Sequence, residues 1–200
     1  MSPRTSAQFD EIRQRSRQRI MDAALELFGT YGYQGTSISK IAQAAGVSKG
    51  LMYNYFSSKQ DLLQAIVISE AEEGAKWAHE IFEQDISAYE KIRQMTLRAI
   101  AEVKKDMHHW RLLTSLAFQP DVMEGIEALV ATYKEPMMRG VITLFAELGI
   151  AEPEKEAFFY GALLDGIFLH YLSAGDQYPL TQVVEYTLQK YKPVAPTQQE

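Results

Sequence analysis

Residues 48–55 combine small, polar and aromatic side chains in a pattern that suits contact with a nucleic acid. Small side chains at the start of such a segment let its backbone enter the major groove of DNA. Lysine can neutralise a phosphate, hydroxyl groups can hydrogen-bond phosphate oxygens, and an asparagine amide can pair with an adenine edge. We therefore predict double-stranded DNA as a partner. The side chains with this chemistry are Ser48, Lys49, Gly50, Tyr53, Asn54 and Tyr55.

The sequence contains no recognisable catalytic or metal-binding motif. It has no cysteine, which excludes disulfides, thiol nucleophiles and cysteine-bound zinc, and which suits a reducing cytoplasm. The four histidines lack metal-binding spacing, and the neighbours His108 and His109 would point about 100° apart on a helix. No nucleophile elbow or phosphate-binding loop is present. We therefore expect no enzymatic activity, no catalytic residues, no metal and no cofactor.

The elements that position residues 48–55 can be predicted from hydrophobic spacing. One face of a helix is formed by Ile20, Ala23, Ala24, Leu27 and Phe28. This helix should begin near residues 9–12 and end before Gly32, with Gly29, Gly32 and Gly35 interrupting the chain. Because these glycines follow a helix and not a strand, they do not form a dinucleotide-binding loop.

Two short helices should follow, joined by a turn that contains a glycine. Ser37 is a suitable N-cap for the first helix, and Ser48 is a suitable N-cap for the second. Together they form a helix-turn-helix pattern over residues 37–56. A capping box at residues 58–61 then opens a longer helix that can continue toward Phe82.

The rest of the chain alternates helical patterns with breakers. Pro136 lies inside one pattern and should kink or split that helix, whereas Pro153 and Pro179 suit the starts of the last two helices. Without any convincing strand, the fold class is all-α, with about nine helices. These later helices should cover residues 92–107, 108–118, 122–148, 154–173 and 179–191, and the tail 193–200 should be disordered.

Charge is distributed unevenly along the chain. Residues 1–60 carry eight basic and four acidic side chains, a net of +4, so residues 61–200 carry −10 because the whole chain carries −6. A polyanion would therefore meet the N-terminal part. No stretch approaches the roughly 18 apolar residues of a membrane span, and residues 1–10 lack a signal-peptide core. We expect a cytoplasmic protein with no membrane partner.

The N-terminal part resembles the DNA-binding domain of the TetR family of transcriptional regulators, of the TetR/AcrR type. The similarity runs without a gap across residues 14–74, and its strongest segments are Arg19–Phe28, Gly32–Ile38, Ile41–Ala42, Gly46–Phe56, Ser58–Lys59 and Asp61–Leu63. The resemblance implies a three-helix DNA-binding domain there and a larger helical domain over residues 75–192 that dimerises and binds a ligand. The DNA contacts that it implies are Thr36, Ser37, Ser48, Lys49, Gly50, Tyr53, Asn54, Tyr55 and Lys59.

Similarity is fainter beyond about residue 80, but residues 161–169 resemble the penultimate helix of the family. That helix and the last helix form a two-fold dimer interface, so the resemblance implies a homodimer that binds a palindromic operator through two recognition helices. Each interface candidate could instead pack inside its own subunit. The candidates are Phe168, Leu169, Leu172, Val183, Val184, Tyr186 and Leu188.

Family members enclose a ligand pocket in the larger domain, and the resemblance implies an unidentified small apolar or amphipathic ligand here. The expected function is that of a repressor that its ligand releases from the operator. An activator of the same fold and a regulator that responds to a protein partner remain open alternatives. The candidate pocket residues, each of which could instead be ordinary core, are Trp110, Leu113, Phe118, Met123, Tyr133, Met137 and Phe159, with Asp165 and His170 as polar anchors.

Overall fold

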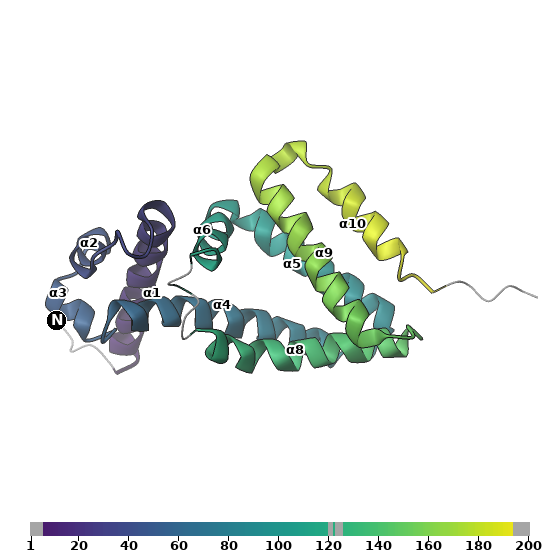
Figure 1. Ribbon diagram of the computed structural model, residues 1–200. Helices are drawn as coiled ribbons and strands as arrows, with labels where there is room; N and C mark the ends of the chain where they lie inside the picture. The colour runs from purple at the N-terminus through teal and green to yellow at the C-terminus, as the bar shows by residue number, and fades with distance from the viewer. Residues whose placement is uncertain (1–5, 120–121, 123–125, 194–200) are drawn as a thin grey trace, which may run out of the picture. The chain divides into compact units, whose positions relative to one another are not determined.

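The computed structural model describes residues 6–119, 122 and 126–193, and every regular element within these residues is a helix (Figure 1). This confirms the all-α fold class. The nine α-helices of the described residues are α1 (Ser6–Tyr31), α2 (Ile38–Ala44), α3 (Lys49–Tyr53), α4 (Lys59–Phe82), α5 (Ala88–Lys105), α6 (Met107–Ala117), α8 (Glu127–Glu147), α9 (Pro153–Ala174) and α10 (Leu180–Gln189), and the short 3-10 helix η1 (Gly175–Gln177) lies between the last two.

The chain divides into two compact units. The head unit comprises Met1–Ala71 and His108–Val130, and the body unit comprises Glu72–Met107 and Ala131–Glu200. The first boundary is close to the one expected at residue 74. The head unit nevertheless also contains nearly all of α6, which the sequence pattern assigns to the larger domain. The expected disordered tail lies outside the described residues from residue 194 onward.

α1 ends where the sequence predicts, but it passes through a glycine that was expected to interrupt it. Gly32 follows the helix with φ +77°, a conformation that glycine adopts at little cost. Gly29 instead lies inside α1, where a Cβ atom would come within 2.2 Å of the Leu112 Cδ2 atom of α6. The close approach of two helices, and not a chain break, therefore explains Gly29.

The helix-turn-helix has the caps that the sequence predicts. The hydroxyl oxygens of Ser37 and Ser48 accept backbone N–H groups three residues later, at 3.3 Å and 3.0 Å. Gly46, in the turn between α2 and α3, has φ +66°. The second helix is shorter than expected, because it ends at Tyr53 and leaves Phe56 in the following turn.

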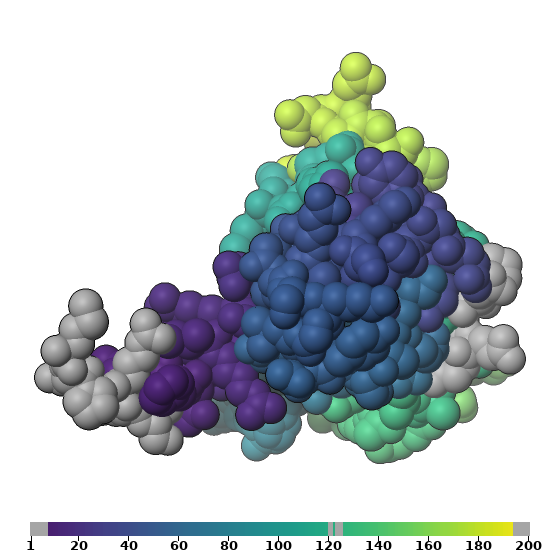
Figure 2. Space-filling view, turned by 90° about the vertical axis from the view of Figure 1, so that its left-hand side faces the viewer, coloured from purple at the N-terminus to yellow at the C-terminus, as the bar shows by residue number. Residues whose placement is uncertain are grey.

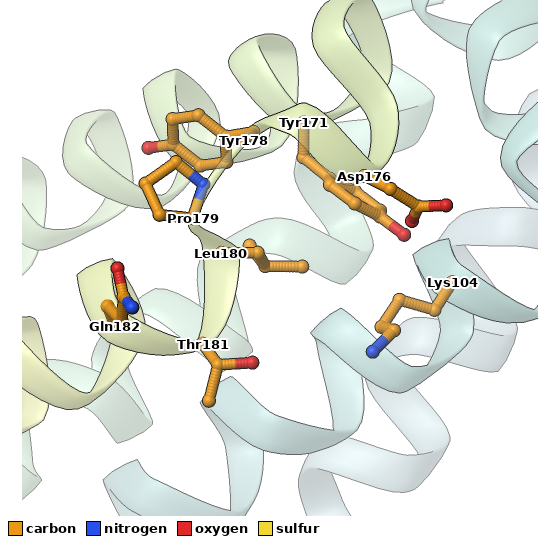
Figure 3. A pocket seen from close by; sticks show the side chains of 8 residues that line it. All are labelled: Lys104, Tyr171, Asp176, Tyr178, Pro179, Leu180, Thr181 and Gln182. Atoms are coloured by element: carbon orange, nitrogen blue, oxygen red, sulfur yellow. The ribbon is translucent and has the colours of Figure 1, made fainter.

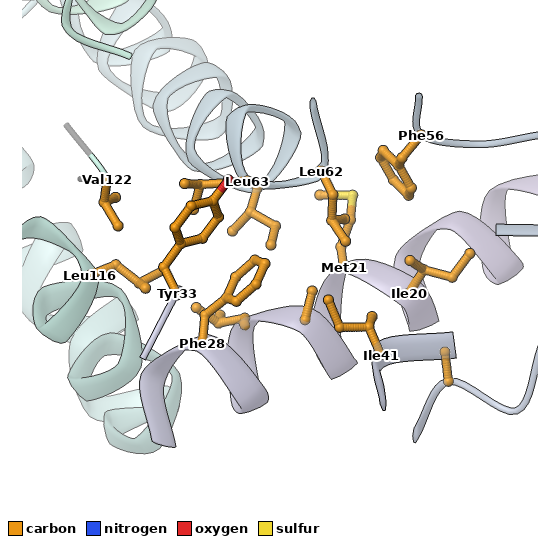
Figure 4. Close-up of a cluster of buried hydrophobic side chains, with 14 of the residues drawn as sticks. Ile20, Met21, Phe28, Tyr33, Ile41, Phe56, Leu62, Leu63, Leu116 and Val122 are labelled. Atoms are coloured by element: carbon orange, nitrogen blue, oxygen red, sulfur yellow. The ribbon is translucent and has the colours of Figure 1, made fainter. Parts of the chain in front are cut away.

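The head unit has an apolar core to which α1, α2, α3, α4 and α6 all contribute (Figure 4). Phe28 lies at its centre, completely buried, with its ring centroid 5.2 Å from that of Tyr33. Leu116 and Val122, which are distant in sequence, fill the same core. Burying an aliphatic side chain of this size contributes about 1.5–3 kcal/mol. α6 is therefore part of the head's own fold.

α8 continues through Pro136 without a break, so the expectation that this proline splits the helix is wrong, whereas a kink there stays a prediction (Figure 1). Pro136 lies on the exposed side of α8. There, water can replace the backbone hydrogen bond that a proline cannot donate.

Three aromatic rings join the helices of the body unit. Phe145, Tyr160 and Tyr191 have ring centroids 5.1–5.6 Å apart. The Tyr160 hydroxyl also hydrogen-bonds Thr96 of α5, and the Tyr191 hydroxyl donates to Glu156 at 2.6 Å. Burial raises the pKa of Tyr160 to about 12, and burial together with the neighbouring Glu156 carboxylate raises the pKa of Tyr191. The cluster thus connects α5, α8, α9 and the segment after α10.

α9 is the most apolar long helix of the described chain. By length and composition alone, Pro153–Gln177 could cross a membrane, with a mean hydropathy of 1.3, contrary to the sequence-based expectation. The helix also packs in the body core through Tyr160, Ile167 and Tyr171. Only 28% of its apolar stretch is buried, however. α9 therefore has an apolar face that its own unit leaves uncovered.

Candidate nucleic-acid interface

α3 has a buried side that anchors it and an open side of small and polar residues. Met52 is completely buried, and Phe56, just after the helix, is 2% exposed. Leu51, which could have served as a third anchor, is 39% exposed. A recognition helix requires this division between an anchored and an open side. The open side consists of Ser48, Lys49, Gly50, Tyr53 and Asn54.

Gly50 is not a packing glycine. A Cβ atom at this position would have no atom of the protein within 4 Å. Packing within the protein therefore does not require a glycine here, and the backbone of α3 is open to an approaching molecule. Tyr53 nearby is 47% exposed, whereas Tyr55 is half-buried against the head core and offers only part of its surface.

The two predicted contacts before α2 have different surroundings. Thr36 is 2% exposed, and its hydroxyl lies 3.0 Å and 2.9 Å from the backbone oxygens of Leu27 and Gly32. Its side chain faces the protein interior and is not available to a phosphate, so its role is to hold the turn after α1. Ser37 is exposed, and its hydroxyl can still donate outward while its oxygen caps α2.

Lys59 also points toward the protein. Its Nζ atom donates to the backbone oxygens of Tyr33 and Thr36, at 2.8 Å and 3.1 Å, and lies 4.2 Å from the centroid of the Tyr33 ring. Burial lowers the pKa of the Lys59 ammonium group. These contacts give Lys59 a structural role, because it fixes the turn that leads into α2, while its phosphate contact stays a prediction.

A residue that the sequence analysis missed supports the same turn from another side. The Gln119 side-chain oxygen, just beyond α6, accepts the backbone N–H of Tyr33 at 2.9 Å. The Tyr33 hydroxyl in turn donates to Gln60 at 2.9 Å. No local pattern could have indicated Gln119, because only the tertiary fold brings it to Tyr33.

Exposed cations surround the open side of α3. Lys49 lies on it, and Lys40 is exposed on α2. The guanidinium carbon of Arg17, from α1, lies 5.2 Å from the centroid of the Phe56 ring. Figure 2 shows this side of the head unit, with residues 40–60 in blue. The face therefore combines hydrogen-bonding side chains with positive charge, as contact with DNA requires.

The sequence that builds this face matches a known family. Residues 20–66 match the family model described as bacterial regulatory proteins, tetR family, which includes α2, α3 and the adjoining parts of α1 and α4. Residues 20–66 are therefore similar to the N-terminal domain of the TetR family. This confirms the resemblance that the sequence motifs indicate.

One relative found by sequence and two solved structures extend the comparison. The transcriptional regulator SrpR from Pseudomonas putida is 41% identical over 69 residues, 34% of this chain and 30% of SrpR. FadR from Bacillus subtilis, solved in complex with stearoyl-CoA, has a TM-score of 0.73 at 20% identity, over 87% of this chain and 96% of FadR. NalD, the secondary repressor of the MexAB-OprM multidrug efflux pump in Pseudomonas aeruginosa, has a TM-score of 0.72 at 22% identity, over 90% of this chain and 95% of NalD. The sequence match thus spans less than a third of SrpR, and the two structures show a shared fold.

Three of the predicted pocket residues lie in the head unit. Leu113 packs against the head core, and Phe118 is 72% exposed. Trp110 is half-buried, with its ring edge-on to that of His109. Leu113 therefore serves the packing of the head. Met123, a fourth candidate, lies outside the described residues.

The other five pocket candidates lie in the body unit. The Tyr133 hydroxyl donates to Glu72 at 2.6 Å, and this carboxylate raises the pKa of Tyr133. Met137 is half-buried, whereas Phe159 is 57% exposed. Asp165 and His170, the predicted polar anchors, are both exposed, and the His170 ring stacks on Tyr178.

None of these candidates lines a pocket of about 280 Å³ in the body unit (Figure 3). This pocket lies where α5, the end of α9, η1 and the start of α10 meet. Its polar walls do not suit an apolar ligand. They are formed by Lys104, Tyr171, Asp176, Tyr178, Pro179, Leu180, Thr181 and Gln182.

The predicted dimer residues divide into interior and surface groups. Leu172, Val184 and Leu188 are 7%, 2% and 5% exposed, so they pack inside the body unit and have little surface to offer a second subunit. Phe168 and Val183 are half-buried. Leu169 and Tyr186 are 41% and 63% exposed. Only the last two are predominantly surface residues.

Proposed function

We propose that this chain is a DNA-binding transcriptional regulator that inserts α3 into the major groove of a palindromic operator. More specifically, we propose a repressor that a small apolar or amphipathic ligand releases. The observation that carries the DNA-binding part is the open side of α3, where Lys49, Gly50 and Asn54 are exposed on a helix that Met52 anchors. With this role we also propose a cytoplasmic location and no enzymatic activity.

We infer that the active form is a homodimer, with α9 in the interface. Phe158, Ala162 and Leu169 are exposed and fall within about 40° of one another around α9. An apolar stripe of this kind, interrupted only by the exposed Asp165 on the same side of α9, favours contact with a partner, and an identical stripe on a second copy satisfies a two-fold axis. Gly166 lies beside this stripe with no neighbouring atom at its Cβ position, which allows close approach of another helix.

The ligand part of the proposal is supported by the relatives. The FadR structure contains stearoyl-CoA, an amphipathic molecule, and NalD is described as a repressor. We expect stearoyl-CoA, used as a probe, to release the protein from DNA, whereas coenzyme A without the acyl chain should not. Tighter DNA binding in the presence of stearoyl-CoA would contradict a repressor and favour the activator alternative.

The DNA-binding proposal can be tested with an operator selected from a random duplex library by the full chain. The affinity for that duplex is then measured at several salt concentrations. Lys49→Ala should lower the slope of log affinity against log salt by about one, because one phosphate contact is lost. Lys134→Ala removes another exposed lysine, from the body unit, and should leave the slope unchanged. If the selection yields no preferred sequence, the proposed function is wrong.

Asn54→Ala tests base recognition separately. If Asn54 contacts an adenine, the variant should lose about 1–3 kcal/mol of discrimination at one operator position, while its affinity for unrelated DNA stays the same. An equal loss on every duplex would instead make Asn54 a phosphate contact.

A further inference from the structure

The first turns of α1 extend beyond the head core. α1 begins at Ser6, but from residue 8 onward its first buried residue is Ser16 and its first buried apolar residue is Ile20. Every residue from 8 to 15 is exposed. At about 1.5 Å per residue, these turns add about 15 Å to the helix. Figure 2 shows them in purple, projecting beyond the blue surface of residues 40–60.

This segment, residues 8–19, which we call the N-terminal arm, carries four exposed arginines. Arg15 is paired with Glu11 at 2.6 Å. The other three, Arg13, Arg17 and Arg19, have no ion pair with any residue that the structure describes. The arm therefore carries positive charge that the protein itself does not neutralise.

Two of these arginines, Arg13 and Arg17, lie on the side of α1 that faces the residues just after α3. The Arg17 guanidinium lies over the Phe56 ring, directly after α3, and also contacts Met21 Sδ at 3.2 Å. Arg13 precedes Arg17 by one helical turn and so lies on the same side of the helix. Arg15 lies about 160–200° away around the helix. The row formed by Arg13 and Arg17 thus extends the positive face around α3.

We propose that the N-terminal arm binds the DNA backbone beside the site that α3 contacts, with Arg13 and Arg17 as phosphate contacts. The inference rests on the proposed DNA-binding function and extends the length of DNA that the protein contacts. A duplex presents one negative charge per about 1.7 Å of its axis, so an arm of twelve residues, about 18 Å long, meets several phosphates. Arginine also suits phosphate, because its planar group donates two parallel hydrogen bonds.

A membrane surface fits the arm less well than DNA does. Phe9 and Ile12 are 57% and 42% exposed, as they would be in a helix that lies on lipid. Phe9, however, precedes Arg13 by one turn on the same side of α1. A membrane-surface helix separates its apolar and basic residues onto opposite faces, and the arm does not.

The test uses the full chain and its selected operator in two duplexes, one with eight extra base pairs on each side and one without. The native protein should bind the longer duplex more tightly. Arg13→Ala and the double variant Arg13→Ala/Arg17→Ala should lose about fivefold to tenfold in affinity per arginine at 0.1 M salt, and about one unit of salt slope per arginine. Because these contacts do not involve bases, the preference for operator over scrambled sequence should persist.

The controls separate this inference from the proposed function. Arg15→Ala, on the other side of the arm, should have little effect, and Arg13→Lys/Arg17→Lys should retain the salt slope. Arg13→Ala alone avoids any effect of Arg17 on the packing of Phe56. Two outcomes would contradict the DNA contact of the arm and leave the proposed function intact. In one, the native protein prefers its operator but does not bind the longer duplex more tightly. In the other, the variants lose only binding to phosphatidylglycerol vesicles. Loss of operator preference by the native protein would overturn both.

Discussion

Two lysines of the same motif have opposite environments in the head unit. Lys49 is exposed on the open side of α3. Lys59 is half-buried, and its ammonium group donates to the two carbonyls of the turn before α2. A motif identifies both positions equally well, but only the surroundings of each ammonium group determine whether it can meet a phosphate.

Lys59→Met should therefore reduce stability, and Lys49→Met should not. Removing the Lys59 ammonium leaves two backbone oxygens without a charged donor, for an expected loss of about 1–2 kcal/mol in the free energy of unfolding. Urea denaturation measures this loss, with Lys49→Met as the matched control, expected within about 0.5 kcal/mol of the native protein. If Lys59→Met keeps full stability but lowers the salt slope of DNA binding, then Lys59 is a phosphate contact after all.

Among the elements, those set by local chemistry could be predicted from the sequence. The serine caps of α2 and α3 and the prolines at the starts of α9 and α10 act within a few residues, so local patterns reveal them. Gly29 and Gln119 could not be interpreted in this way, because their partners come from a segment distant in sequence. The sequence pattern likewise gives the length of α6 but not the unit in which it packs.

The contact between α1 and α6 predicts the effect of Gly29→Ala. In an exposed helix this change stabilises by up to about 1 kcal/mol, because alanine has the higher helix propensity. Here the new Cβ atom would lie 2.2 Å from Leu112 Cδ2 and 2.9 Å from Leu112 Cβ, so Leu112 must move. We expect a net loss of about 1–3 kcal/mol, measured by urea denaturation.

Gly74→Ala is the matched control for Gly29→Ala. Its Cβ atom would meet nothing closer than the Trp77 side chain at 4.0 Å, so this variant should be as stable as the native protein or slightly more stable. Equal stabilisation by both variants would contradict the close packing of α6 on α1.

At the scale of the whole molecule, the exposed stripe on α9 predicts the oligomeric state. Leu169→Glu places a charge in an apolar interface and should convert the dimer into monomers at micromolar concentration, as measured by light scattering. Operator affinity should fall with it, since each monomer reaches only one half-site. Phe118→Glu, which changes a 72% exposed residue of the head unit, should leave the dimer intact. Native protein that is already monomeric would rule out the interface.

The tyrosine cluster of the body unit predicts alkaline instability. The pKa of Tyr160 is about 12 in the folded protein against 10.0 unfolded, so the folded state retains a proton that the unfolded state loses. The contribution of this proton to the free energy of unfolding is complete below pH 10 and is lost as the pH rises through 12. The total loss is about 2–3 kcal/mol. Tyr160→Phe cannot ionise.

Urea denaturation between pH 9 and 11.5 should therefore show a shallower loss of stability for Tyr160→Phe, by up to about 1.4 kcal/mol per pH unit. Tyr186→Phe changes a residue that is 63% exposed and should reproduce the native pH dependence. Identical slopes for Tyr160→Phe and the native protein would show that the Tyr160 proton does not stabilise the fold.

The packing of α6 in the head unit has a consequence for synthesis on the ribosome. The helix-turn-helix leaves the exit tunnel early, but the core positions of Leu116 and Val122 stay empty until the chain has grown past residue 130. At roughly 5–20 residues per second, the residues between 71 and 130 take about 3–12 seconds to translate. During that interval the nascent head lacks part of its core. The order of synthesis therefore delays a complete head unit until most of the chain has been made.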